Sequence, residues 1–245
     1  MSWNTVQEAL SAVHPPCPYR FEMMSRDETA DVIASILGWY PEISVGVASC
    51  FVQPEFYERK VAFAGEAGKS FIVVLIKRGR EIVGLLACES EHEAQTLYGR
   101  LAIVAPEHRG AGLGQYSIEL IEAIGQALGM GLIYGMATLK IPHVQQAFER
   151  LGWQLIGIAP GYDRELVSPG VVKRVYEAVY AKVLVGASDL LLPRWGDMTP
   201  RTRELFELLF AERMQPIRAG GTATGFDTFT LPPSTRRNAW EMKHE

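Results

Sequence analysis

The chain has 245 residues, of which 48% are hydrophobic, so it can bury a substantial core. Its formal net charge of -4 argues against a nucleic-acid partner, because proteins neutralise a phosphate backbone with an excess of basic residues. No uncharged apolar run approaches the roughly 20 residues that span a bilayer, and the first residues lack the pattern of a secretory signal. The three scattered cysteines form no CxxC pair and suit a reducing compartment rather than a zinc site. We therefore expect a cytoplasmic globular protein with no nucleic-acid partner, no membrane partner and no bound metal.

The first elements are short. Apolar residues at helical spacing over residues 3–13 predict a leading helix, which the prolines after it end. The segment YRFEMM, residues 19–24, predicts a strand. Ser25 and Glu28 then form a capping box for a second helix, which Gly38 is expected to end.

The central elements carry stronger signals. Residues 39–68 mix prolines with aromatics and are expected to form loops with at most a short helix. Two apolar, β-rich runs follow, and they flank Arg78 and Gly79 in a way that is typical of a hairpin. A third strand is predicted over residues 97–104. An amphipathic helix comes next, with one face made of Leu113, Tyr116, Leu120, Ile121, Ile124 and Leu128.

The remaining pattern completes a sheet. A buried strand is predicted after Met130, and a helix from Pro142 ends at the glycine of LGW. Two final strands are WQLIGIA and KRVYEAVYAKVLV. The order predicts an α/β protein of the α+β type, with a mixed central β-sheet flanked by helices. We expect one domain over residues 1–186, with its core at 71–182, and an extension over 187–245 that holds one helix and a mobile tail.

The segment VAPEHRGAGLG, residues 104–114, joins the third strand to the amphipathic helix. A strand that runs through glycine-rich backbone into a helix N-terminus gathers N–H groups under a positive dipole, which favours an anion such as phosphate. Arg109 adds charge, while Gly110, Gly112 and Gly114 let a ligand approach the backbone. A plain flexible loop is the alternative.

Two common phosphate motifs do not fit. The GxGxxG fingerprint fails, because Gln115 or Ser117 stands where its third glycine is required. The segment FAGEAGKS, residues 63–70, ends like a P-loop, but Phe63 replaces its first glycine and a strand follows it. We expect a turn there.

The pattern R-x-x-G-x-G from Arg109 to Gly114, preceded by a strand, resembles the acetyl-CoA pyrophosphate motif of the GNAT superfamily of N-acetyltransferases. REIVGLLACES resembles the third strand of that family, and QQAFERLGWQLIG is similar to its second signature. The resemblance covers residues 71–182, with residues 19–33 as the first strand and helix. It implies a GNAT fold with N- and C-terminal extensions. It also implies transfer of an acetyl group from acetyl-CoA to a small-molecule or peptide amine, by direct attack in a ternary complex, and leaves a homodimer open.

The resemblance assigns a cofactor site to this chain. It implies that the backbone of Ile103 and Val104 lies along the pantetheine arm. The N–H groups that it directs at the pyrophosphate belong to Arg109, Gly110, Ala111, Gly112, Leu113 and Gly114.

The catalytic positions depart from the family. Phe148 stands where the family has a tyrosine, so it can line the CoA arm or pack in the core but cannot donate a proton. The usual glutamate of the central strand falls near Arg100 and is absent, and Glu89 is the nearest replacement unless ESEHE is only an exposed hairpin. Tyr134 and Tyr162 could supply a hydroxyl, but the spacing selects neither. These departures leave open a CoA-binding regulator without catalysis. A second alternative is transfer from a longer acyl thioester, which the segments outside the core would accommodate.

Overall fold

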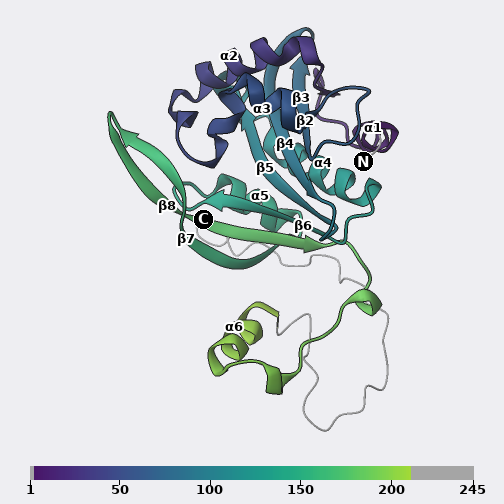
Figure 1. Ribbon diagram of the computed structural model, residues 1–245, viewed down its shortest axis with the longest axis vertical. Helices are drawn as coiled ribbons and strands as arrows, with labels where there is room; N and C mark the ends of the chain where they lie inside the picture. Colours follow the sequence, from purple (N-terminus) through teal and green to yellow (C-terminus); the bar gives the residue numbers. More distant parts are fainter. Residues whose placement is uncertain (1–2, 211–245) are drawn as a thin grey trace, which may run out of the picture. The chain divides into compact units, whose positions relative to one another are not determined.

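The computed structural model describes residues 3–210 (Figure 1). The helices are α1 (Trp3–Ala12), α2 (Thr29–Trp39), α3 (Pro54–Lys60), α4 (Leu113–Ala127), α5 (His143–Arg150) and α6 (Pro200–Phe210). The strands are β1 (Tyr19–Met23), β2 (Val61–Ala62), β3 (Phe71–Arg78), β4 (Glu81–Glu91), β5 (Thr96–Val104), β6 (Leu132–Thr138), β7 (Gln154–Ser168) and β8 (Val171–Val183). The mixed sheet flanked by helices that the sequence predicted is confirmed.

The sheet is built largely from hairpins. Its strand order is β1-β3-β4-β5-β6-β8-β7, with β2 beside β3. The β3–β4 hairpin turns at Gly79, whose φ of 61° lies in the left-handed region that favours glycine. β5 and β6 pair in parallel, since α4 connects them across one face of the sheet. β7 and β8 form a long hairpin whose tip reaches beyond the other strands (Figure 1).

Helices cover both faces of this sheet. One hydrophobic cluster joins α1, α4 and α5 to alternate residues of the strands, among them Leu97 and Ile133. The other joins α2 and α3 to the opposite face, where Leu75 and Leu85 are buried. The alternation follows from the two-residue period of a strand, which sends neighbouring side chains to opposite faces. Each face of the sheet is therefore covered by different helices, and the candidate site has residues on both faces.

Residues 41–60 are more ordered than the sequence predicted. They contain two 3-10 turns, Pro41–Ser44 and Val47–Val52, followed by α3. Their buried side chains, including Phe51 and Tyr57, pack into the cluster on the α2 face. Such short elements are stabilised by tertiary packing rather than by a periodic local pattern, so the sequence did not reveal them. The expected end of α2 at Gly38 was also wrong by one residue, because the helix continues to Trp39.

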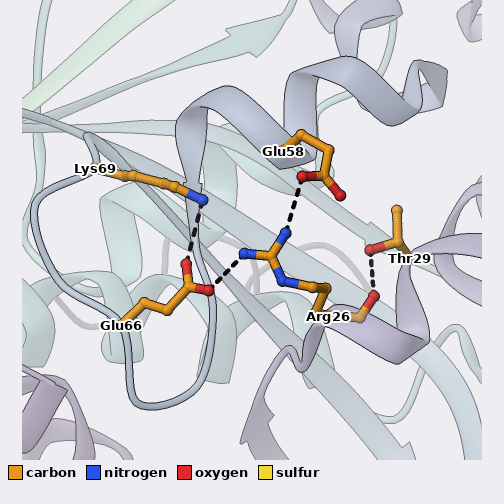
Figure 2. Close-up of polar contacts among 5 residues, drawn as sticks. All are labelled: Arg26, Thr29, Glu58, Glu66 and Lys69. Atoms are coloured by element: carbon orange, nitrogen blue, oxygen red, sulfur yellow. Dashed lines mark hydrogen bonds and ion pairs between the residues drawn. The ribbon is translucent and has the colours of Figure 1, made fainter.

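Arg26 forms ion pairs with two segments that are distant from it in sequence (Figure 2). Its guanidinium lies 3.0 Å from Glu58 of α3 and 2.6 Å from Glu66 in the turn after β2. Lys69 lies 3.2 Å from the same Glu66, and both cations lie over the ring of Phe63. The segment FAGEAGKS is thus a turn held by ion pairs and a ring contact.

Residues up to Leu184 form one compact unit, and a second unit begins at Val185. The described part of the second unit contains α6, where Phe206 contacts the rings of Trp195 and Phe210. The tail expected after α6 lies outside the described residues. Across residues 3–210, no helix is long and apolar enough to cross a membrane.

Candidate functional site

The loop between β5 and α4 has the geometry of an anion cradle. Gly110 and Gly112 have φ values of 84° and 76°, which only glycine adopts without strain. A Cβ atom at Gly110 or Gly114 would meet nothing within 4 Å, so the space beside this backbone is open. Within the described chain, no hydrogen bond engages the N–H groups of residues 110–114. Gly112 is the N-cap of α4, so these donors stand at the positive end of a helix dipole.

Arg109 lies at the entrance to this loop. Its Nε is 3.4 Å from the carbonyl oxygen of Val104, and its guanidinium lies 5.2 Å from the ring centroid of Tyr40. The side chain is exposed, so its charge can reach an anion in solution. The structure thus brings together Arg109 and the glycines that the sequence singled out.

β5 and β6 diverge just before this loop. Their pairing runs from Thr96 to Gly99 on β5 and ends at Gly135 on β6, although both strands continue. Beyond Gly99, β5 keeps its pairing with β4 as far as Val104. Its opposite edge therefore presents backbone N–H and C=O groups, including those near Ile103 and Val104, without a strand partner. An extended ligand arm can pair with such an edge.

Two glycines form the vertex where the strands part. A Cβ atom at Gly99 would lie 3.2 Å from Cδ1 of Ile121 on α4. A Cβ atom at Gly135 would lie 2.9 Å from Cζ of Phe148 on α5. Phe148 is buried and stacks on Tyr180 at 5.1 Å between centroids. Phe148 thus packs in the core, directly beneath the point where β5 and β6 part.

The opposite face at the vertex is polar and aromatic. A bulge in the β4–β5 pairing leaves Arg100 without a partner residue on β4. Nε of Arg100 lies 3.6 Å from Oε2 of Glu89, and its guanidinium lies 5.0 Å from the ring centroid of Tyr98. Glu89 is therefore paired with a cation rather than unengaged.

Three tyrosines gather on this face, and the hydroxyl groups of two of them are in contact. Tyr98 and Tyr134 are cross-strand partners whose rings stack at 4.6 Å. The Tyr98 hydroxyl lies 3.1 Å from that of Tyr162 on β7, and the Tyr134 hydroxyl donates to Glu91 at 3.0 Å. Burial raises the pKa of both Tyr98 and Tyr134 above the usual tyrosine value, so both phenols stay protonated. Sequence reasoning considered Tyr134 and Tyr162 but missed Tyr98, because only the strand register joins them.

Glu177 on β8 is a further acid on this face. On β8, Glu177 pairs with Thr138 of β6, and Ala181 pairs with Tyr134. Glu177 and Ala181 are four residues apart on one strand, so Glu177 points to the same face as Tyr134. Burial, and then the charges of Asp163 and Glu165, raise its pKa to about 7. Among the described residues, none donates a hydrogen bond to the Glu177 carboxylate or forms an ion pair with it. An acid inside a predicted strand was the only sequence signal for this residue.

The loop before α3 is fixed against the same face. Asp163 accepts a hydrogen bond from the N–H of Val47 at 2.8 Å. Gly46 has a φ of 91°, and a Cβ atom there would lie 2.4 Å from the backbone oxygen of Arg164. The irregular part of β7, where the pairing with β8 shifts between Ala159 and Asp163, thus holds residues 46–47 over the sheet.

The described residues contain no cluster of three or more His, Cys, Asp or Glu side chains that could hold a metal ion. The site combines an anion cradle, an unpaired strand edge, and acids and phenols on the opposite face of the sheet. A glycine-lined helix N-terminus next to an unpaired strand edge suits an extended anionic ligand.

Residues 33–153 match the model of the acetyltransferase (GNAT) family. The structure of mutant forms of a spermidine/spermine N-acetyltransferase from Vibrio cholerae is similar, with a TM-score of 0.54, 14% identity and 69% of this chain and 95% of that chain covered. A probable acetyltransferase from Staphylococcus epidermidis has a TM-score of 0.51, 7% identity and coverage of 68% and 99%. The microcin C7 self-immunity acetyltransferase in complex with acetyl-CoA and AMP has a TM-score of 0.50, 14% identity and coverage of 69% and 94%. No curated protein matches.

The chain contains a GNAT acetyltransferase domain at residues 33–153, and the resemblance inferred from its glycine motif is confirmed. The family match spans the cradle, the diverging strands and the helix that carries Phe148. It ends before β7 and β8, so it does not include Tyr162 or Glu177.

Proposed function

We propose that the protein is an N-acetyltransferase that transfers the acetyl group of acetyl-CoA to an amine by direct attack within a ternary complex. The observation that carries this proposal is the open glycine loop at the N-terminus of α4, next to the unpaired edge of β5. The residues fit the cosubstrate, because Arg109 and the N–H groups of residues 110–114 suit a pyrophosphate. The backbone of Ile103 and Val104 suits the amide-bearing pantetheine arm. The similar acetyltransferase in complex with acetyl-CoA supports this donor.

The reaction requires proton movements at two atoms. The acceptor nitrogen forms a C–N bond with the thioester carbonyl carbon, the C–S bond breaks, the nitrogen loses a proton and the thiolate gains one. A group that accepts the first proton works best with a pKa near the working pH. Glu177, with a pKa of about 7, fits this requirement, whereas the carboxylate of Glu89 is engaged by Arg100. We therefore add Glu177 to Glu89 as a candidate base.

Phe148 has no hydroxyl, so another residue must donate the proton to the thiolate. The joined hydroxyls of Tyr98 and Tyr162 lie across the sheet from Phe148, and each can act as donor. We propose that this pair supplies the proton. The acceptor is a small-molecule or peptide amine, bound on the face that carries these tyrosines.

The experiment measures thiol release from acetyl-CoA with a panel of amines, for the wild type and for E177Q, E89Q and the exposed control E93Q. We expect an activity profile that rises with an apparent pKa near 7, and we expect E177Q to abolish this rise while E93Q keeps it. If E89Q alone removes the rise, Glu89 is the base. If E177Q and E89Q both retain it, neither carboxylate is.

Two alternatives have distinct outcomes in the same assay. Turnover of long acyl-CoA molecules but not of acetyl-CoA would change the donor. Tight CoA binding without turnover of any amine would favour a CoA-binding regulator, an alternative motivated by Phe148 and by the Arg100–Glu89 pair. Absence of CoA binding would contradict all three functions.

Three broader expectations remain proposals. We keep residues 1–186 as the acetyltransferase domain and 187–245 as an extension. The free thiols of Cys17, Cys50 and Cys88 suit the reducing cytoplasm. A homodimer suits the edge strand β7, which exposes Ile156 and Ile158, and light scattering of the purified chain tests it.

A further inference from the structure

The residue before Arg109 connects the glycine loop to the starts of β1 and β4. His108 is buried, with 8% of its surface exposed. Its Nδ1 lies 3.1 Å from the hydroxyl of Tyr19 at the start of β1, and the two rings meet edge to face at 5.7 Å. Its Nε2 lies 3.7 Å from Oε1 of Glu81 at the start of β4. One imidazole therefore contacts two strands that are not its neighbours in sequence.

The backbone before His108 is equally well held. The N–H of His108 donates to the carbonyl of Ala105 at 2.9 Å, and the N–H of Ala105 donates to the carbonyl of Val83 at 2.8 Å. After Arg109 this support ends, because no described residue accepts from the N–H groups of residues 110–114. His108 is thus the last buried side chain before the cradle opens.

From these contacts we infer that His108 is a positioning residue, which holds the glycine loop in the conformation that binds the diphosphate of CoA. The inference rests on the proposed function. A glycine-rich loop without this anchor has many accessible conformations. Apparent affinity then falls in proportion to the fraction of molecules whose loop is competent to bind. The vertex, where the acyl group would react, is built from β5 and β6 and does not include His108.

The expected signature is therefore a loss of donor affinity without a loss of turnover at saturating donor. We expect H108L to weaken CoA binding about tenfold, as when only about a tenth of the loops stay competent. An asparagine amide can occupy the place of Nδ1, so H108N should recover most of this affinity through Tyr19. Y19F should weaken binding about threefold in the wild type, with little further effect in H108L. Such non-additivity would show that the two residues act through one contact.

The test is isothermal titration of the full chain with CoA, with a thermal melt of each variant. Y57F is the control, since it also removes a hydrogen-bonded tyrosine hydroxyl. The Tyr57 hydroxyl donates to the carbonyl of Phe51 at 2.8 Å, and Tyr57 is far from the loop in sequence. We expect Y57F to lower the melting temperature while CoA affinity stays unchanged. Should H108L fail to fold, Y19F and H108N carry the same test.

The outcomes separate this inference from the proposed function. A wild type that binds no CoA contradicts the proposed function itself. A wild type that binds CoA, with H108L and Y19F binding equally well, contradicts the role of His108. Additive losses without rescue by H108N also contradict it, because they indicate general destabilisation.

Discussion

Gly99 of β5 and Gly135 of β6 are the last residue pair before the two strands diverge. Neither glycine has a positive φ, so conformational freedom does not explain them. Space does, because a Cβ atom at Gly135 would press on Phe148 and one at Gly99 would press on Ile121. The vertex is therefore set by how closely α4 and α5 approach the sheet.

Substitution of Gly135 tests this packing. We expect Gly135→Ala to destabilise the protein by about 1–3 kcal/mol, since its Cβ would lie 2.9 Å from Cζ of Phe148. Gly157→Ala on β7 is the control, because a Cβ atom there meets nothing within 4 Å. Phe148→Leu should restore part of the loss in the Gly135→Ala background. Urea denaturation measures all four proteins, and equal costs at Gly135 and Gly157 would refute the packing explanation.

Substitution of Gly112 tests the anion cradle. Gly112 and Gly129 both have a positive φ, of 76° and 67°, and they lie at opposite ends of α4. Aspartate at either position should cost about 1 kcal/mol of stability through backbone strain. Only Gly112→Asp places a carboxylate at the proposed diphosphate site, so we expect CoA affinity to fall about 100-fold or more. Titration calorimetry measures the CoA affinity of both variants. Unchanged affinity in Gly112→Asp would show that the diphosphate does not bind at this loop.

Glu177 should make stability depend on pH. Its pKa is raised from 4.5 to about 7 in the folded state, so the folded protein holds a proton that the unfolded chain releases between these values. Stability from this group is fully present below pH 4.5 and is lost as the pH rises through 7. We therefore expect Glu177→Gln to match the wild type near pH 5 and to be more stable at pH 8, by on the order of 1–2 kcal/mol. Denaturation at both pH values measures the difference, and a constant difference would count against the raised pKa.

Local patterns predicted what depends on local sequence. The hairpin at Gly79, the strand before Val104 and the glycine loop each follow from a short run of residues, and the structure has them all. The acceptor face depends instead on register. Tyr98 and Tyr162 are 64 residues apart, and Tyr162 lies in the stretch of β7 where the pairing with β8 shifts register. No periodic signal in the sequence encodes that meeting.

Residue roles were harder to predict where two structural demands coincide. Glu89 was expected as a base from its place at the end of β4, but the bulge that accommodates Arg100 gives it a cationic partner. The role of His108 was missed, because its partners Tyr19 and Glu81 come from other strands. A short sequence motif predicts the proposed donor site, which is made of backbone, whereas the proposed acceptor side is made of side chains from five strands and has no such motif.

The sheet at the vertex can be probed through a thiol. Cys88 is the β4 partner of Gly99 and is fully buried, and burial raises its pKa to about 12. At pH 8 the fraction of thiolate is then about 1 in 10,000, so we expect labelling only when β4 opens. Cys17 is exposed and should react first, with the half-buried Cys50 between them. Mass spectrometry of the labelled peptides gives each rate.

The labelling rate of Cys88 also reports the free energy of opening β4. We expect this free energy to equal that of global unfolding, because β4 lies between β3 and β5 in the sheet. Fast labelling of Cys88 in the native protein would show that the strands beside the vertex open independently.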